Sequence, residues 1–283
     1  MIILDLSQVM LSNIMVQIGN HTNAQVEESM VRHMVLNSIR MYRSKFCPEF
    51  GEFVIACDNK NYWRRQIFPY YKANRKKSQA ASELNWKEIF ECLNKIRAEL
   101  KEFFPYRVVD VESAEADDVI ATLCKGNHQK EKILILSGDK DFVQLQRYDN
   151  VQQYDPVRKK FLVNKNPLEF LKEHILKGDV GDGVPNVLSS DNCFVVGERQ
   201  KPLTSKRLEE LMKTDFGIKT DHPAYRNYLR NKQLIDLTEI PDDVGYKIVE
   251  SFDSQSGKKK VDLFNYFMAH RLKNLMENIG DFY

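Results

Sequence analysis

The stretch KILILSGDKDFVQL, residues 132–145, decides the fold of this chain. Its apolar residues 133–136 are bounded by turn residues, which predicts a short buried strand. Asp139 and Asp141 follow that strand almost at once. Open α/β sheets carry their chemistry at the carboxyl ends of strands, so these two acids mark a candidate site. Taken alone, they would be better interpreted as a solvated acidic turn.

Carboxylates recur at equivalent positions elsewhere in the chain. The apolar stretches IILDLS and EFVIACD carry Asp5 and Asp58 at their ends, and EADD at residues 115–118 opens a helical stretch just before the central strand. Acids repeated at several strand ends are hard to explain as surface decoration. Within EADD, Glu115 and Asp118 share a helix face and Asp117 is turned by about 100° from Asp118, so only part of the cluster can face one site. Asp117 or Asp118 is alternatively a helix-capping residue.

Strands alternate with helices over residues 1 to about 148, which predicts an α/β fold with a mostly parallel central sheet flanked by helices. From about residue 165 the pattern changes to helices and loops. We therefore expect an α/β core over residues 1–164 and a smaller helical region over residues 165–283. The predicted strands are residues 2–6, 53–57, 106–111, 133–136, 151–154 and 161–163, and the predicted helices include 24–46, 85–104, 115–125 and 168–176.

Composition excludes several classes of protein. The chain has 283 residues, of which 42% are hydrophobic and 29% charged, as in ordinary globular proteins. No apolar run approaches the roughly 18 residues of a membrane span, and the first residues lack the features of a secretory signal. The five cysteines form no C-x-x-C pair, so we expect reduced thiols in a cytosol-like compartment and no zinc site.

A basic and aromatic segment, residues 59–84, follows the second predicted strand. Six cations fall within fourteen residues of it, and Pro69 predicts two short helical pieces or a mobile loop. Because cations suit phosphates and flat rings suit bases, we interpret this segment as a track for single-stranded nucleic acid rather than as a solvated basic face. The cations are Arg64, Arg65, Lys72, Arg75, Lys76 and Lys77, interleaved with Tyr62, Trp63, Phe68, Tyr70 and Tyr71.

The order of these motifs resembles the flap endonuclease/5′-nuclease family. The motifs are two strand aspartates, the second followed by the basic and aromatic segment, then EADD (115–118), SGDKD (137–141) and KGDVGDGVP (177–185). Each motif alone is a weak signal, but together they cover nearly the whole chain, which is most similar to the T-even phage branch. The resemblance implies a PIN-like 5′-nuclease core, an arch segment at residues 59–84 and a helix–three-turn–helix around residues 168–212.

The same resemblance implies an activity and its cofactors. It implies a structure-specific 5′ to 3′ nuclease in phage DNA replication, a phosphodiester hydrolase with RNase H-type, exonuclease and flap endonuclease action. Two Mg²⁺ ions are implied, with Mn²⁺ as a substitute, since hard oxygen ligands suit both. The implied metal ligands are Asp5, Asp58, Glu115, Asp117, Asp118, Asp139, Asp141, Asp179 and Asp182, and the implied catalytic residues are Lys72, Arg75, Asp117 and Asp139.

Nucleic-acid contacts are implied at two places. The arch segment contributes Arg64, Arg65, Tyr70, Tyr71, Lys72 and Arg75, whereas Arg199, Lys201, Thr204, Ser205 and Lys206 lie at the start of a later helix, a natural site for phosphate. Some family members also bind K⁺ through backbone carbonyls in the glycine-rich turn. Here the sequence after Val187 departs from that pattern, so the K⁺ site stays open.

Other functions fit part of the pattern. A PIN-like ribonuclease shares the acidic strand ends but lacks the arch segment and the glycine-rich turn. A haloacid-dehalogenase-type phosphatase needs a second aspartate that Asp5-Leu6-Ser7 does not supply. A non-catalytic DNA junction-binding protein would carry vestigial acids, yet no acid of the family pattern is missing.

The resemblance also suggests where and with what the protein acts. We expect RNA–DNA hybrid, 5′ flap and nicked duplex DNA as substrates, in the cytoplasm of an infected bacterial host, with no membrane partner and a monomeric state. A single-strand-binding protein and a sliding clamp are candidate partners, although the C-terminal MENIGDFY presents no evident glutamine-led clamp motif.

Overall fold

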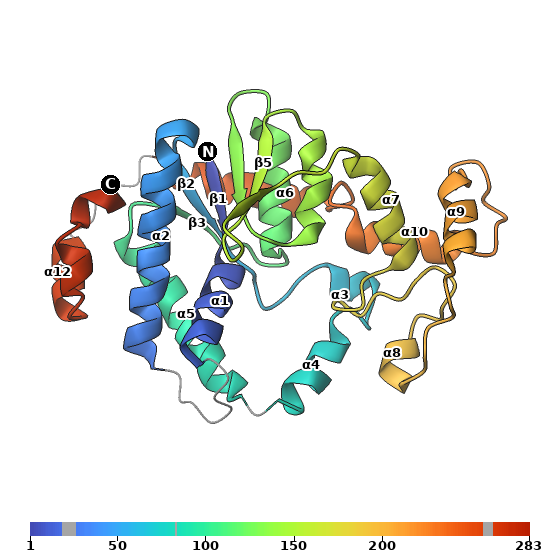
Figure 1. The fold of residues 1–283 in the computed structure, drawn as a ribbon, viewed down its shortest axis with the longest axis horizontal. Helices are drawn as coiled ribbons and strands as arrows, with labels where there is room; N and C mark the ends of the chain where they lie inside the picture. The colour runs from blue at the N-terminus through green and yellow to red at the C-terminus, as the bar shows by residue number, and fades with distance from the viewer. Residues whose placement is uncertain (19–26, 83, 257–262) are drawn as a thin grey trace.

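The chain folds around a six-stranded sheet with strand order β3-β2-β1-β4-β5-β6 (Figure 1). A computed structural model describes residues 1–18, 27–82, 84–256 and 263–283. The first five strands of that order are parallel, and β6 pairs antiparallel with β5. The strands are β1 (Ile2–Asp5), β2 (Phe53–Ala56), β3 (Arg107–Val109), β4 (Ile133–Leu136), β5 (Val151–Asp155) and β6 (Lys160–Leu162).

Both faces of the sheet are covered because the central strands are apolar throughout. In β1, Ile2 and Leu4 join one buried cluster and Ile3 joins the other, as the alternation of side chains along a strand requires. Helices α1 (Leu6–Ile18), α2 (Glu28–Phe50), α5 (Trp86–Phe103), α12 (Leu263–Ala269) and α13 (Lys273–Met276) pack on the first face with the 3₁₀-helix η2 (Ile279–Phe282). Helices α6 (Ala116–Asn127) and α11 (Asp242–Asp253) pack on the second with the 3₁₀-helix η1 (Lys140–Arg147).

The remaining helices form a smaller region beside the sheet. They lie at the opposite end of the molecule from α12 (Figure 1). Two further apolar clusters hold them together, one of which joins the arch segment to α7 and α10. These helices are α3 (Arg64–Ile67), α4 (Ala73–Ala80), α7 (Pro167–Lys177), α8 (Cys193–Val196), α9 (Ser205–Lys213) and α10 (Tyr225–Ile235).

The predicted α/β fold with a mostly parallel sheet is confirmed, and all six predicted strands are present to within a few residues. The two short helical pieces expected around Pro69 are α3 and α4. The start of the predicted helix 24–46 lies outside the described residues, and α2 continues to Phe50. The helix α1 was not predicted, because it begins at Leu6 with no residue between it and β1.

No helix within the described ranges combines the length and the apolar character that a bilayer span requires.

A buried ion pair ties α2 to α5 and to the C-terminal helices. Arg32 binds Glu99 through two contacts of 2.7 Å, and the hydroxyl of Tyr266 donates to Glu99 at 2.7 Å. Arg32 and Glu99 are only 4% and 8% exposed. Burial would raise the pKa of Glu99, but the hydrogen bonds from Arg32 and Tyr266 hold it below its usual range. The network therefore fixes the C-terminal helices onto the core.

We expect the substitution Glu99→Ala to lower the free energy of unfolding by about 3 kcal/mol, since it leaves the buried Arg32 guanidinium with only the more exposed Glu28 as its partner. Glu102→Ala, on the exposed side of the same helix, is the matched control and should change it by less than about 0.5 kcal/mol. Denaturant unfolding measures both. Equal stability of the two variants would contradict a structural role for the pair.

Candidate active site

An acidic cleft of about 470 Å³ lies where the carboxyl ends of the parallel strands meet the glycine-rich turn. Seven aspartates line it, with two cations of the arch segment at its edge. They come from strand ends, from the first turn of α6 and from the turn after α7, so the sheet topology gathers acids that lie far apart in sequence. The lining includes Asp5, Ser7, Gln8, Asp58, Lys72, Arg75, Asp117, Asp139, Lys140, Asp141, Asp179 and Asp182.

Asp5 is the most firmly held of the strand-end acids. It is 7% exposed and accepts hydrogen bonds from the Ser137 hydroxyl at 3.0 Å and from the Gln8 amide at 3.1 Å. Burial, followed by the nearby charge of Asp58, raises the pKa of Asp5 to about 7. Asp58 accepts from the Ala116 amide at 2.9 Å, which links β2 to the start of α6.

Asp117, Asp139 and Asp141 crowd the centre of the cleft. Burial and the charge of Asp139 raise the pKa of Asp117 well above its usual range, and the same two causes raise the pKa of Asp141 to about 7. Asp139 accepts from the Asp141 amide at 3.0 Å and so caps η1. Carboxylates packed this closely favour a proton or a cation between them.

The glycine-rich turn (residues 177–187) brings two more acids to the cleft. Asp179 and Val184 pair in a short antiparallel bridge, so the chain reverses within a few residues. Gly178 has a φ of 69°, and a Cβ there would stand 2.4 Å from the Val184 carbonyl oxygen. Only glycine fits that position, which explains its place before Asp179.

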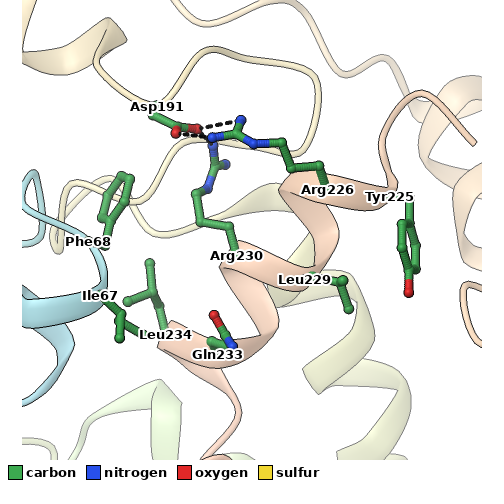
Figure 2. A pocket seen from close by; sticks show the side chains of 9 residues that line it. All are labelled: Ile67, Phe68, Asp191, Tyr225, Arg226, Leu229, Arg230, Gln233 and Leu234. Atoms are coloured by element: carbon green, nitrogen blue, oxygen red, sulfur yellow. Dashed lines mark hydrogen bonds and ion pairs between the residues drawn. The ribbon is translucent and has the colours of Figure 1, made fainter. Parts of the chain in front are cut away.

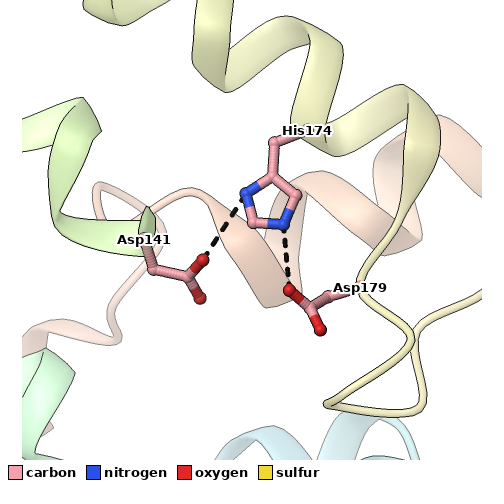
Figure 3. A group of neighbouring side chains, drawn as sticks. All are labelled: Asp141, His174 and Asp179. Carbon is pink, nitrogen blue, oxygen red and sulfur yellow. Dashed lines mark hydrogen bonds and ion pairs between the residues drawn. The ribbon is translucent and has the colours of Figure 1, made fainter. Parts of the chain in front are cut away.

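His174 is a site residue that the sequence analysis missed. It lies in the last turn of α7, is 7% exposed, and stands between Asp141 and Asp179 (Figure 3). Burial would raise the pKa of Asp179, but hydrogen bonds from His174 and Lys140 outweigh it and keep that pKa below the usual range. Nothing in the sequence indicates this role, because histidine is common in the last turn of a helix, where the helix dipole favours it.

These three residues could hold a metal ion, because their ligand atoms all lie within 4.8 Å of one another. The buried Oδ1 of Asp141 has no hydrogen-bond partner within the described part of the chain. A buried carboxylate oxygen without a partner, beside aspartates of raised pKa, is suited to bind a cation. The residues of the cleft therefore fit divalent metal.

The arch segment docks onto the glycine-rich turn. The Lys72 amide donates to the Asp182 carbonyl oxygen at 2.7 Å, and a Cβ on Gly183 would stand 3.0 Å from the Tyr70 carbonyl oxygen. Lys72 has a φ of 55°, a strained backbone for a residue with a side chain. Its ammonium pairs with Glu115 and lies 3.6 Å from Asp182, and Arg75 also pairs with Asp182.

Burial would lower the pKa of Lys72, but the charges of Glu115 and Asp182 raise it above its ordinary value. Lys72 is therefore a fixed cation at the cleft.

Glu115 and Asp118 do not line the cleft. Glu115 is 1% exposed and bonded to Lys72, Arg64 and Tyr71, whereas Asp118 is fully buried and closes a capping box with Glu115 at the start of α6. Asp118 also accepts from the Trp63 indole at 3.2 Å. The capping alternative that the sequence left open is thus realised for Asp118.

Arg64 and Tyr71, which the resemblance implies as nucleic-acid contacts, are both buried in this structure. Arg64 is 1% exposed, pairs with Asp118 at 2.8 Å and donates to the Leu234 carbonyl oxygen. Tyr71 is 3% exposed, and its hydroxyl donates to Asp182 at 2.8 Å. The sequence could not distinguish the buried side chain of Arg64 from the exposed one of Arg65, because the two arginines are neighbours in α3. The side chains of Arg64 and Tyr71 face acids rather than solvent.

The other predicted nucleic-acid residues lie nearer to solvent. Arg65 is exposed and Tyr70 half-buried, and the side chains of Lys76 and Lys77 lie outside the description. Thr204 caps α9 by accepting from the Arg207 amide. The five residues that were predicted to contact the duplex are all exposed, and none of them lines the acidic cleft: Arg199, Lys201, Thr204, Ser205 and Lys206.

A second hollow, of about 420 Å³, lies between α3 and α10 (Figure 2). Arg226 and Arg230 point toward each other there and both pair with Asp191. None of the predicted site residues lines it.

Comparison with protein families divides the chain into two matches. Residues 2–175 match the model described as 5′-3′ exonuclease, N-terminal resolvase-like domain, and residues 168–282 match the one described as T4 RNase H, C terminal.

Individual relatives agree with these families. The chain is 35% identical over 292 residues to ribonuclease H of Enterobacteria phage T4, covering 99% of this chain and 95% of that protein. It is also 31% identical over 136 residues to the flap endonuclease Xni of a Shewanella strain, MR-4, covering 44% of this chain and 48% of that protein.

Solved structures share the fold at low sequence identity. A bacteriophage T5 flap endonuclease in complex with DNA and metal ions aligns with a TM-score of 0.62 and 17% identity, covering 90% of this chain and 98% of that one. A T5 5′-exonuclease with bound zinc aligns with a TM-score of 0.61 and 16% identity, with the same coverage.

The raised pKa of Asp5 predicts a pH-dependent cost of folding in the absence of metal. Because the pKa is about 7 in the folded state and 3.8 as the ordinary value, the native state retains a proton that the unfolded state loses, and stability falls as pH rises through this window. We expect Asp5→Asn to raise the melting temperature in EDTA at pH 8 and to have little effect near pH 4.

The exposed Asp149→Asn serves as the control and should leave the melting temperature unchanged at both pH values. Added Mg²⁺ should narrow the difference between Asp5→Asn and the parent protein at pH 8. A parent protein that is as stable as Asp5→Asn in EDTA at pH 8 would rule out this cost.

Proposed function

The chain belongs to the 5′-3′ exonuclease family, and we propose that it is a metal-dependent, structure-specific 5′ to 3′ nuclease that hydrolyses phosphodiester bonds at 5′ ends. The acidic cleft is the observation that carries this proposal, because it joins seven aspartates to the cations Lys72 and Arg75. Phosphodiester hydrolysis uses acids that hold metal beside cations that attract phosphate. A protein that only binds duplex DNA has no use for the acids.

We assign Mg²⁺ as the physiological metal, since the cleft offers hard carboxylate oxygens. Two bound Mg²⁺ ions would activate the attacking water and stabilise the charge that develops on the scissile phosphate. The aspartates of the cleft would hold them: Asp5, Asp58, Asp117, Asp139, Asp141, Asp179 and Asp182. Glu115 and Asp118 act one layer further out in this scheme, because they orient Lys72 and the first turn of α6.

Lys72 and Arg75 would act directly on the substrate. Each is a cation at the edge of the cleft. Lys72 pairs with Glu115 and Arg75 with Asp182, and a substrate phosphate would join or replace these acids as the partner of each cation. A preorganised cation stabilises a developing negative charge without reorganising in the reaction. The strained backbone of Lys72 fits such a fixed role.

The substrate path follows the exposed bases and rings. Arg65 and Tyr70 would contact the single strand, and the exposed residues from Arg199 to Lys206 would hold the duplex through its phosphates. In this scheme residues 1–164 form the nuclease core together with α11, α12 and α13, which pack on the faces of the sheet. The helices α7 and α9 belong to the smaller region that would bind the duplex. Arg64 and Tyr71 support the arch segment from beneath.

The relative from phage T4 is a ribonuclease H, which favours removal of RNA from RNA–DNA hybrid as one activity beside cleavage of 5′ flaps and nicked duplex. We place this action in DNA replication in the cytoplasm of a phage-infected bacterial host. A monomer, with a single-strand-binding protein and a sliding clamp as replication partners, completes the proposal.

The first test is cleavage of a 5′-labelled flap and a 5′-labelled RNA–DNA hybrid, with Mg²⁺ and with EDTA. Short 5′ products that require Mg²⁺ are expected, and Asp139→Asn should abolish them while DNA binding persists. Asp149→Asn is the control of equal charge change. Tight binding without products from the parent protein would instead identify a junction-binding protein.

A second test addresses the cations. Lys72→Met should slow flap cleavage by about 10²–10³-fold, because a fixed cation at the phosphate is lost. Lys87→Met removes a solvent-exposed cation from α5 and should leave the rate unchanged. Single-turnover rates at saturating substrate separate this effect from binding, and equal rates for the two variants would exclude Lys72 from the chemical step.

A further inference from the structure

His174 presents its two ring nitrogens to two different aspartates. Nε2 lies 3.1 Å from Asp179 Oδ2, a hydrogen-bond distance, whereas Nδ1 lies 3.6 Å from Asp141 Oδ1 (Figure 3). His174 is 7% exposed, so its ring nitrogens interact with neighbouring protein groups rather than with solvent.

Asp179 already accepts from three donors. Its Oδ1 accepts from the Asp182 amide at 3.0 Å, and its Oδ2 is 2.7 Å from the Lys140 ammonium as well as 3.1 Å from His174. A carboxylate in this position holds an imidazole by accepting its N–H, which places the proton on Nε2. Asp179 therefore orients His174 and leaves the lone pair of Nδ1 on the other side of the ring.

That lone pair faces an acceptor. Asp141 Oδ1 is buried and has no hydrogen-bond partner among the residues that the structure describes. Two acceptors 3.6 Å apart repel one another unless a proton or a metal ion lies between them. When one metal ion binds a nitrogen and an oxygen at about 2.0–2.2 Å each, the two ligand atoms lie roughly 3–4 Å apart. The separation of His174 Nδ1 from Asp141 Oδ1 falls in this range.

We propose that His174 Nδ1 and Asp141 form a mixed nitrogen–oxygen site for a divalent transition-metal ion, with Asp179 as the carboxylate that positions the imidazole. This deepens the metal-dependent function proposed above and rests on it, since Asp141 lines the same cleft. One side of the cleft then differs from the other in chemistry. The side of Asp5 and Asp58 offers oxygen alone, which suits Mg²⁺, whereas the side of His174 prefers transition metals over Mg²⁺.

Mn²⁺ is a suitable probe because it is paramagnetic. We would load the full-length protein with less than one equivalent of Mn²⁺ in excess Mg²⁺, which occupies the all-oxygen positions. Pulsed electron paramagnetic resonance should detect a ¹⁴N nucleus bound to Mn²⁺ in the parent protein, and the coupling should change on labelling with ¹⁵N-histidine. His174→Gln should remove it and weaken Mn²⁺ binding by about 10-fold or more.

The matched control is His33→Gln, a histidine of α2 outside the cleft, which should keep both the nitrogen coupling and the Mn²⁺ affinity. Calorimetric titration with Mn²⁺ and with Mg²⁺ gives the selectivity, which should fall in His174→Gln only. The parent protein alone supplies a decisive reading if the variant does not fold.

Absence of nitrogen coupling in the parent protein, with the same Mn²⁺ to Mg²⁺ selectivity in both variants, would overturn the proposal. His174 would then only bridge Asp141 and Asp179 within the protein. The flap assay of the parent protein in Mg²⁺ reports on the nuclease function separately: loss of products there contradicts the function, whereas an unchanged selectivity contradicts only the role of His174.

Discussion

The burial of mutually repelling carboxylates, which a parallel sheet concentrates at one edge, is the constraint on which the rest of this structure depends. Asp5, Asp117 and Asp141 all have a raised pKa, and burial is the largest cause for each. Buried cations beside the cleft offset part of this negative charge. Arg64 is buried against Glu115 and Asp118, and Lys72 is buried against Glu115. Those pairs anchor the arch segment beside the cleft. Charge balance thus ties the arch segment to the sheet.

The same balance joins the two regions of the chain. The arch segment contacts the glycine-rich turn through the backbone hydrogen bond from Lys72 and through the Asp182 side chain, while Phe68 and Tyr71 pack with residues of α7 and α10. A segment read from sequence as a nucleic-acid track is therefore also a structural bridge. Its inward side chains neutralise acids, and its outward ones, such as Arg65, are left for solvent or a ligand.

Most of the fold was predictable because it depends on short-range patterns. The apolar runs of β1, β2 and β4 and the acids at their ends follow local rules of burial and strand termination. Features that depend on tertiary contact were not predictable. Nothing local distinguishes buried Arg64 from exposed Arg65, or marks His174 as the neighbour of Asp141, and α1 escaped because no turn residue separates it from β1.

The direct passage from β1 into α1 also limits how this protein can vary in length. Asp5 ends the strand and Leu6 begins the helix. One inserted residue would rotate α1 by about 100° and shift it by about 1.5 Å relative to the sheet, moving Val9 and Ile14 away from the core. Asp5 and the first turn of α1 consequently form a single rigid unit. Insertions and deletions near the site are tolerable only at other strand ends, where a connecting loop absorbs the added length.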